Sequence, residues 1–196
     1  MNYFLDLIYQ LLVHPREALR TVTRGERLSQ SGAVWVFVIF ITSLSSIVEG
    51  PGFVTVFSLC LLGLAMTLIL HSAVIDYAAS MIGGRGTAKG ITAGFMMASF
   101  PYAFSVFGTL LSAAGADGIA GFLGFVIAVW SFVLDVLAIS ENYGFSTGKS
   151  VLVALIPVLL IAVFFLCLMI LGVAAAIDGI SQMDGAGLMN EMMQEI

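Results

Sequence analysis

The chain has 196 residues, of which 60% are hydrophobic and 10% are charged, and its net charge is −5. Soluble domains hold roughly 45–50% apolar and about 25% charged residues, so this composition excludes an ordinary soluble fold and, equally, intrinsic disorder. Seven basic residues argue against nucleic-acid binding, and the cysteines, Cys60 and Cys167, are too few for a disulfide-rich secreted domain. We therefore expect an all-α integral membrane protein.

Residues 1–30 are expected to form amphipathic and basic helices at the cytoplasmic membrane surface. Apolar side chains share one face of residues 2–13, namely Phe4, Leu5, Ile8, Leu11 and Leu12. Pro15 suits the first turn of a second helix, which carries a basic residue every three or four positions: Arg16, Arg20, Arg24 and Arg27. Each arginine near an anionic leaflet contributes about 1 kcal/mol. The alternative to surface binding is that the first helix packs on the protein itself.

Residues 31–180 are expected to form a transmembrane domain of five spans. A spanning helix needs about 20 mostly apolar residues, and continuous apolar runs cover 33–48, 53–79, 90–114, 118–140 and 150–177. The first run is short and is extended by residues 29–32. Pro101 and Pro157 fall inside the third and fifth spans, where neighbouring helices re-satisfy the freed carbonyls. Residues 181–196 are expected to form a short acidic tail outside the membrane.

The distribution of basic residues predicts the orientation of the spans. Arginines precede the first span, Arg85 and Lys89 lie between the second and third, and Lys149 lies between the fourth and fifth. The other connections hold acidic residues but no lysine or arginine. By the positive-inside rule the N-terminus is cytoplasmic and the C-terminus is periplasmic. We expect a multi-pass protein of the cell inner membrane.

Small residues recur every fourth position in two spans. The third span carries Gly86, Gly90, Gly94 and Ala98, and the fourth carries Ala120, Gly124 and Ala128. Such faces let helices approach closely. We expect contacts within the chain, with contact between copies as the alternative.

Ionisable groups inside spans are costly and suggest function. A candidate polar cluster consists of His71, Asp76, Asp135 and Glu141, all near the cytoplasmic boundary by residue count. Hydrogen bonding and ion pairing within the protein is one explanation, and a proton, ion or substrate site is another. We expect no metal site and no cofactor, because a single histidine among scattered carboxylates lacks ligand spacing.

A glycine-rich basic loop is the second candidate site. Gly83, Gly84, Arg85 and Gly86, with Lys89 close behind, offer backbone amides and two cations to an anion or a lipid headgroup. The alternative is a tight connection between two helices. The stretch 144–150 matches a nucleophile elbow and part of a phosphate loop, but it lacks the strand that both motifs require. We expect no catalytic residue.

The order of these features resembles the Yip-domain membrane proteins in their short bacterial form. The resemblance rests on His14-Pro15-Arg16-Glu17, on the loop at 83–86, on Pro101 and Trp130, and on the segment 144–149. It implies a cytoplasmic N-terminus, five spans and a short C-terminal tail. Eukaryotic members associate with Rab-type GTPases in early secretory trafficking, but their Asp-Leu-Tyr-Gly-Pro motif is absent here.

Sequence and resemblance together favour a non-enzymatic membrane protein that acts as a scaffold or adaptor, or in membrane organisation and trafficking. Its expected partners are the lipid bilayer and other membrane proteins or itself, and not nucleic acid. Two alternatives remain open. The chain is an accessory subunit of a larger membrane complex, or it is a small permease or ion pathway that uses the polar cluster.

Overall fold

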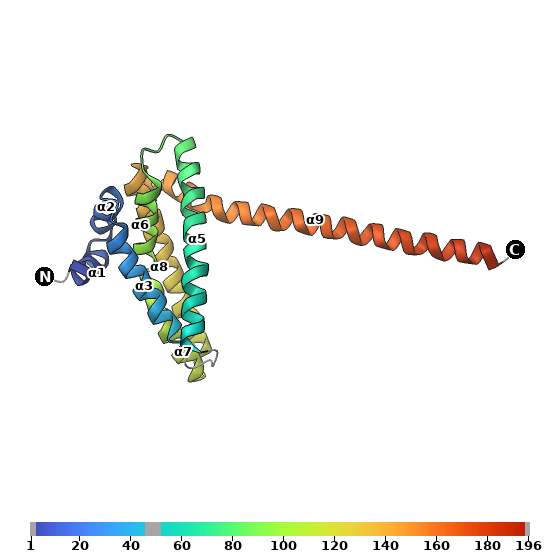
Figure 1. Ribbon diagram of the computed structural model, residues 1–196, viewed down its shortest axis with the longest axis horizontal. Coiled ribbons are helices and arrows are strands. Elements are labelled where there is room, and N and C mark those ends of the chain that lie inside the picture. The colour runs from blue at the N-terminus through green and yellow to red at the C-terminus, as the bar shows by residue number, and fades with distance from the viewer. Residues whose placement is uncertain (1–2, 46–51, 195–196) are drawn as a thin grey trace. The chain divides into compact units, whose positions relative to one another are not determined.

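The computed structural model describes the backbone of residues 3–45 and 52–194 and the side chains of residues 5–45 and 52–175. All regular structure in these ranges is helical, as expected of an all-α protein (Figure 1). In chain order the elements are α1 (Tyr3–Val13), α2 (Pro15–Arg24), α3 (Leu28–Ser43), α5 (Phe53–Met81), α6 (Ala88–Ala98), the 3₁₀ helix η1 (Phe100–Phe104), α7 (Ser105–Ala113), α8 (Asp117–Tyr143) and α9 (Thr147–Gln194).

The chain divides into two compact units, residues 1–156 and 157–196. The first unit holds α1 to α8 and the first turns of α9. The second unit starts at Pro157 and is the remainder of α9, which continues to Gln194.

Four helical segments are long and apolar enough to cross a membrane. They are α5, α6 to α7 taken together, α8 and the part of α9 from Thr147 to Ala175. The first of the five expected spans is not among them. Helix α3 has 16 residues and is therefore about 24 Å long, whereas the hydrocarbon core of a bilayer is about 30 Å thick. The predicted end of that span, at residues 46–48, lies outside the described residues.

The third span, expected to be continuous over residues 90–114, is interrupted at Pro101. Proline lacks a backbone N–H, and its ring interferes with the preceding helical turn. The chain accordingly leaves the α-helical path after α6, passes through η1 and resumes as α7. Phe100 and Pro101 of η1 are both buried.

Helix α2 is part of the core of the first unit. Pro15 lies in its first turn, as predicted. Ala18, Leu19 and Val22 recur on one helix face and are fully buried, and α2 packs against both α6 and α8. The segment that carries the arginine series therefore seats one face on the transmembrane helices and keeps its arginines exposed.

Glycines on α6 permit this packing. A Cβ atom on Gly90 would overlap the Asn142 side chain of α8 and lie 2.6 Å from the Thr23 carbonyl oxygen of α2. A Cβ on Gly94 would lie 2.8 Å from the Cβ of Ala138 on α8. The small residues of the third span thus serve contacts within the chain, as expected.

Candidate functional site

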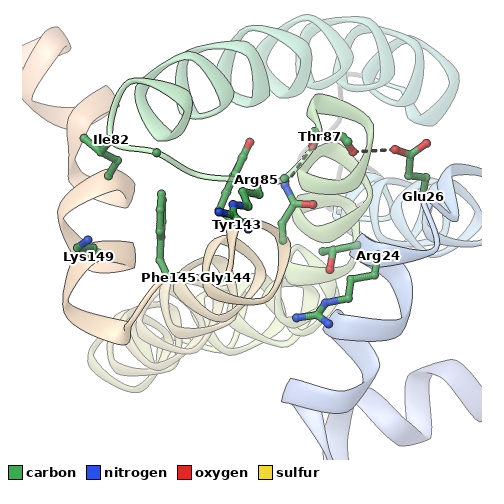
Figure 2. Close-up of a pocket in the computed structure, with 13 residues that line it drawn as sticks. Arg24, Glu26, Ile82, Arg85, Thr87, Tyr143, Gly144, Phe145 and Lys149 are labelled. Carbon is green, nitrogen blue, oxygen red and sulfur yellow. Dashed lines mark hydrogen bonds between the residues drawn. The ribbon is translucent and has the colours of Figure 1, made fainter.

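A basic pocket of about 640 Å³ lies at one end of the first unit (Figure 2). We call this end, where α2, the α5–α6 loop and the α8–α9 loop meet, the basic end. Arg24 comes from α2, Arg85 from the α5–α6 loop and Lys149 from the start of α9. The polar side chains that line the pocket include Thr87, Asn142 and Tyr143. Basic residues from three distant segments therefore converge, as the predicted sidedness of the loops requires.

Glycines shape the two loops of the pocket. Gly83, after α5, and Gly144, after α8, have φ values of +86° and +71°, a region that other residues enter at a cost. A Cβ on Gly86 would lie 2.5 Å from the Asn142 Nδ2 atom and 2.6 Å from the Tyr143 ring. The α5–α6 loop therefore lies directly against the end of α8, and it carries Arg85 into the pocket.

The start of α6 is fixed by a network across three elements. Thr87 caps the helix, and its Oγ1 accepts a hydrogen bond from the Gly90 amide at 3.0 Å. The same hydroxyl donates to Glu26 Oε1 at 2.8 Å, and Asn142 Nδ2 donates to the Thr87 carbonyl oxygen at 3.0 Å. Glu26, the acidic side chain that lines the pocket, is thus hydrogen-bonded to Thr87.

The basic side chains of the pocket differ in whether they have a hydrogen-bond or ion-pair partner. Arg24 Nε donates to the Glu141 carbonyl oxygen at 3.4 Å. Among the described residues, the side chains of Arg85 and Lys149 have no hydrogen-bond or ion-pair partner. Two exposed, unpaired cations beside hydroxyl and amide groups can bind an anion, above all a phosphate group.

The predicted anion loop is therefore placed at the pocket, with two differences. Gly83, Arg85 and Gly86 line the pocket, whereas Gly84 packs under the Tyr143 and Phe145 rings and Lys89 is not among the lining residues. Arg24 and Lys149 join Arg85 there instead. No sequence signal links Arg24 to this pocket, because Arg24 lies about sixty residues before the loop and only the packing of α2 brings it near.

The arginines expected at the membrane surface are exposed but not equivalent. Arg16 Nε forms an ion pair with Glu141 Oε1 at 3.1 Å, and Arg27 donates to Gln30. Arg24 faces the pocket, and Arg20 has no partner among the described residues. The series therefore also anchors α2 to the end of α8.

Helix α1 divides its apolar side chains between protein and surroundings. Leu7 and Leu11 are buried against the core, whereas Leu5, Tyr9 and Leu12 are 47–65% exposed. The packing that we gave as the alternative to surface binding thus occurs, but it uses only part of the apolar surface of α1.

The structure does not bring the four residues of the predicted polar cluster together. Glu141 pairs with Arg16, Asp76 accepts a 2.8 Å hydrogen bond from the Tyr143 hydroxyl, and His71 and Asp135 line a separate cavity of about 220 Å³. Helix geometry explains the separation. At 3.6 residues per turn, Asp76 points about 140° away from His71, and Glu141 points about 120° away from Asp135.

The segment 144–150 is a helix connection. Helix α9 begins at Thr147, directly after Ser146, whose carbonyl oxygen accepts a 3.0 Å hydrogen bond from the Ser150 amide. No strand precedes it in the described chain.

Comparisons with known proteins fix the family. No curated protein and no solved structure matches the chain. The family model described as the Yip1 domain matches residues 9–188. The matched region takes in the helices that build the basic pocket, from α2 to the start of α9. The chain therefore belongs to the Yip1 domain family of membrane proteins.

Proposed function

We propose that this Yip1-domain protein is a non-enzymatic membrane scaffold or adaptor that binds phosphate-bearing lipid headgroups in the basic pocket. The observation that carries the proposal is the pair of unpaired cations, Arg85 and Lys149, in a cavity of about 640 Å³ beside Thr87 and Asn142. Such cations between helices at a membrane surface are typical of headgroup sites.

The N-terminal helices support this role. Leu5, Tyr9 and Leu12 form an exposed apolar surface on α1, and Arg20 on α2 is exposed without a partner in the described chain. Apolar side chains that enter the headgroup region, with cations beside them, bind anionic bilayers. We infer that α1 and α2 lie at the interface and hold the pocket at headgroup level.

The proposed orientation places the basic end in the cytoplasm and the protein in the inner membrane. Helix α3 begins near α6 through the Glu26–Thr87 bond, and its Phe40 ring contacts Phe53 and Phe57 at the start of α5. It therefore runs alongside α5 in the opposite direction. We propose that α3 is a fifth, short span over which the bilayer thins, which places the C-terminus outside.

The test measures lipid binding to the purified full chain in mild detergent. Native mass spectrometry would count bound phosphatidylglycerol against phosphatidylcholine, with inorganic phosphate in a separate arm. Arg85→Gln and Lys149→Gln should each weaken phosphatidylglycerol binding by about fivefold, the equivalent of about 1 kcal/mol per cation. Lys89→Gln is the matched control, because Lys89 lies near the loop but outside the pocket lining.

Two results would overturn the lipid assignment. Equal losses in Lys89→Gln would show attraction to the surface in general and not to the pocket. Binding of inorganic phosphate as tight as that of the lipid would assign the pocket to a soluble phosphate compound.

An accessory-subunit role is the second candidate, and the exposed apolar side chains of α5 favour it. Val54, Leu62, Met66 and Leu70 are each 67–74% exposed. Co-purification of one stoichiometric membrane partner, lost when these four residues are changed together to alanine, would favour this role.

A further inference from the structure

The cavity of about 220 Å³ between α3, α5, α6, η1 and α8 is distinct from the basic pocket and shares no lining residue with it. Its walls are mainly apolar and aromatic, with Trp35, Phe95 and Tyr102 among them. Into this setting α5 places His71, and α8 places Ser131 and Asp135.

These three polar side chains lack protein partners. Ser131 is 3% exposed, and its Oγ has no hydrogen-bond partner. In the described chain, no hydrogen bond or ion pair involves Asp135, and the contact that His71 makes is ring to ring, edge-on to Phe95 with centroids 4.7 Å apart. A polar group left without a hydrogen-bond partner in an apolar setting is unfavourable, so three such groups at one cavity indicate a ligand.

The cavity lies well inside the spans. Helices α5 and α8 end at Met81 and Tyr143, two and three residues beyond the predicted ends. His71 is therefore about 15 Å from the end of α5, and Asp135 about 12 Å from the end of α8. Asp135 is therefore deeper than residue counting on the sequence indicated, and an ionisable group at such depth is by default a candidate functional site.

The volume of the cavity and the types of side chain that line it narrow the class of ligand that it can bind. Pockets for organic ligands measure about 300–1,000 Å³, which exceeds this cavity. No group of three metal-ligating side chains occurs among the described residues, whereas zinc sites use at least three. A carboxyl, an imidazole and a hydroxyl are the groups that hold and pass a proton, with water between them.

We propose that His71, Ser131 and Asp135 form a proton-binding site inside the transmembrane helices. The site takes up one proton from the solvent. The proton bonds to a carboxylate oxygen of Asp135 or to an imidazole nitrogen of His71. The Ser131 hydroxyl forms a hydrogen bond with the site in either protonation state. The titratable groups that line the cavity are His71 from α5, Tyr102 from η1 and Asp135 from α8, while α3 and α6 contribute none. Asp76, the carboxylate of α5, is bonded to Tyr143 instead.

The test is infrared difference spectroscopy of the full chain in nanodiscs over a pH titration. Wild type should show a protonated-carboxyl band that Asp135→Asn abolishes. His71→Gln should shift the midpoint of that band, and Ser131→Ala should keep the band but move its frequency, because one hydrogen bond is lost. Asp76→Asn is the matched control and should leave the band unchanged.

The proposal fails if the titrating band survives in Asp135→Asn or disappears in Asp76→Asn. It also fails if both His71→Gln and Ser131→Ala leave the band untouched, a result that remains informative should Asp135→Asn not fold. None of these variants touches Arg85 or Lys149, so the outcome is independent of the headgroup site.

Discussion

Two helix contacts, which we call seams, carry small residues at every fourth position but differ in how tightly they pack. The first joins α6 to α2 and α8, and the second joins α8 to α7. Gly86 in the loop before α6, and Gly90 and Gly94 on α6, lie so close to α2 and α8 that an added Cβ would collide with a neighbour at each position. On α8, Gly124 has nothing within 4 Å of its Cβ position, and together with Ala120 it faces α7 across a cavity of about 310 Å³. Small residues at every fourth position permit a neighbouring helix to approach closely. Whether that helix does pack closely depends on the rest of its own surface.

The difference lies in the partners. Residues of α2 and α8 that meet the α6 series are themselves small or flat, such as Thr23 and Ala138. Helix α7 has nine residues and none of them is buried, so little apolar surface holds it against α8. The first seam therefore should be intolerant of added volume and the second tolerant.

The largest effect is expected for Gly90→Leu. Its Cβ alone overlaps Asn142 and crowds a backbone carbonyl that cannot move aside, and the bond from Asn142 to Thr87 is lost with it. Overpacking and the lost hydrogen bond together should cost about 2–4 kcal/mol. Thermal unfolding in detergent, followed by the fluorescence of Trp35 and Trp130, measures it. An unchanged unfolding temperature would contradict the close packing of α6 against α2 and α8.

A smaller loss is expected for Gly94→Ala, about 1–3 kcal/mol. Its new methyl meets the Cβ of Ala138 at 2.8 Å and the Thr23 methyl at 2.9 Å. Adding Ala138→Gly removes one of the two clashes. The double variant should therefore be more stable than the sum of the single effects predicts, with a coupling of about 0.5–3 kcal/mol. Strict additivity would show that the two residues do not touch.

Gly124→Ala should have the opposite sign. The added methyl enters open space and lowers the entropy of the unfolded chain, so stability should rise by about 0.5–1 kcal/mol. The same unfolding experiment detects it. A destabilisation as large as that of Gly94→Ala would erase the distinction between the two seams.

The smallest effect is expected for Arg16→Gln, which breaks the ion pair with Glu141. Arg16 is 60% exposed while Glu141 is 13% exposed, and exposed pairs contribute about 0.2–1 kcal/mol. The loss should shrink in concentrated salt, because salt screens the attraction. Comparing wild type and variant at two salt concentrations tests this. A loss independent of salt would assign the effect to packing of the arginine stem.

The helices themselves were predictable from the sequence because the apolar runs are long and continuous. Helices α5 and α8 match their predicted spans to within three residues at each end, and the break at Pro101 follows from its missing N–H. The length of α3 was not predictable, since its polar first residues gave no sign of where the helix would begin or end.

Side-chain grouping was less predictable than the helices. Residue counting compares depth along a helix but ignores rotation about its axis, so Asp76 and Glu141 were grouped with His71 and Asp135 although they face other neighbours. The basic pocket depended on long-range packing too. Arg85 was predictable from its glycine loop, whereas Arg24 required knowledge that α2 packs on α6 and α8.

The packing of α2 against α6 and α8 also has a consequence for biosynthesis. Its partners are made late, since the Glu26–Thr87 bond joins residues 61 positions apart and the Arg24–Glu141 bond joins residues 117 positions apart. At 5–20 residues per second, a ribosome needs roughly 6–23 s to add 117 residues. Until α6 and then α8 are made, Leu19 and Val22 lack the transmembrane helices that cover them in the folded chain. If α2 binds the leaflet nearest the ribosome, as we propose, that contact would keep it from aggregation until α8 is inserted, and its surface affinity would serve assembly before it serves the finished protein.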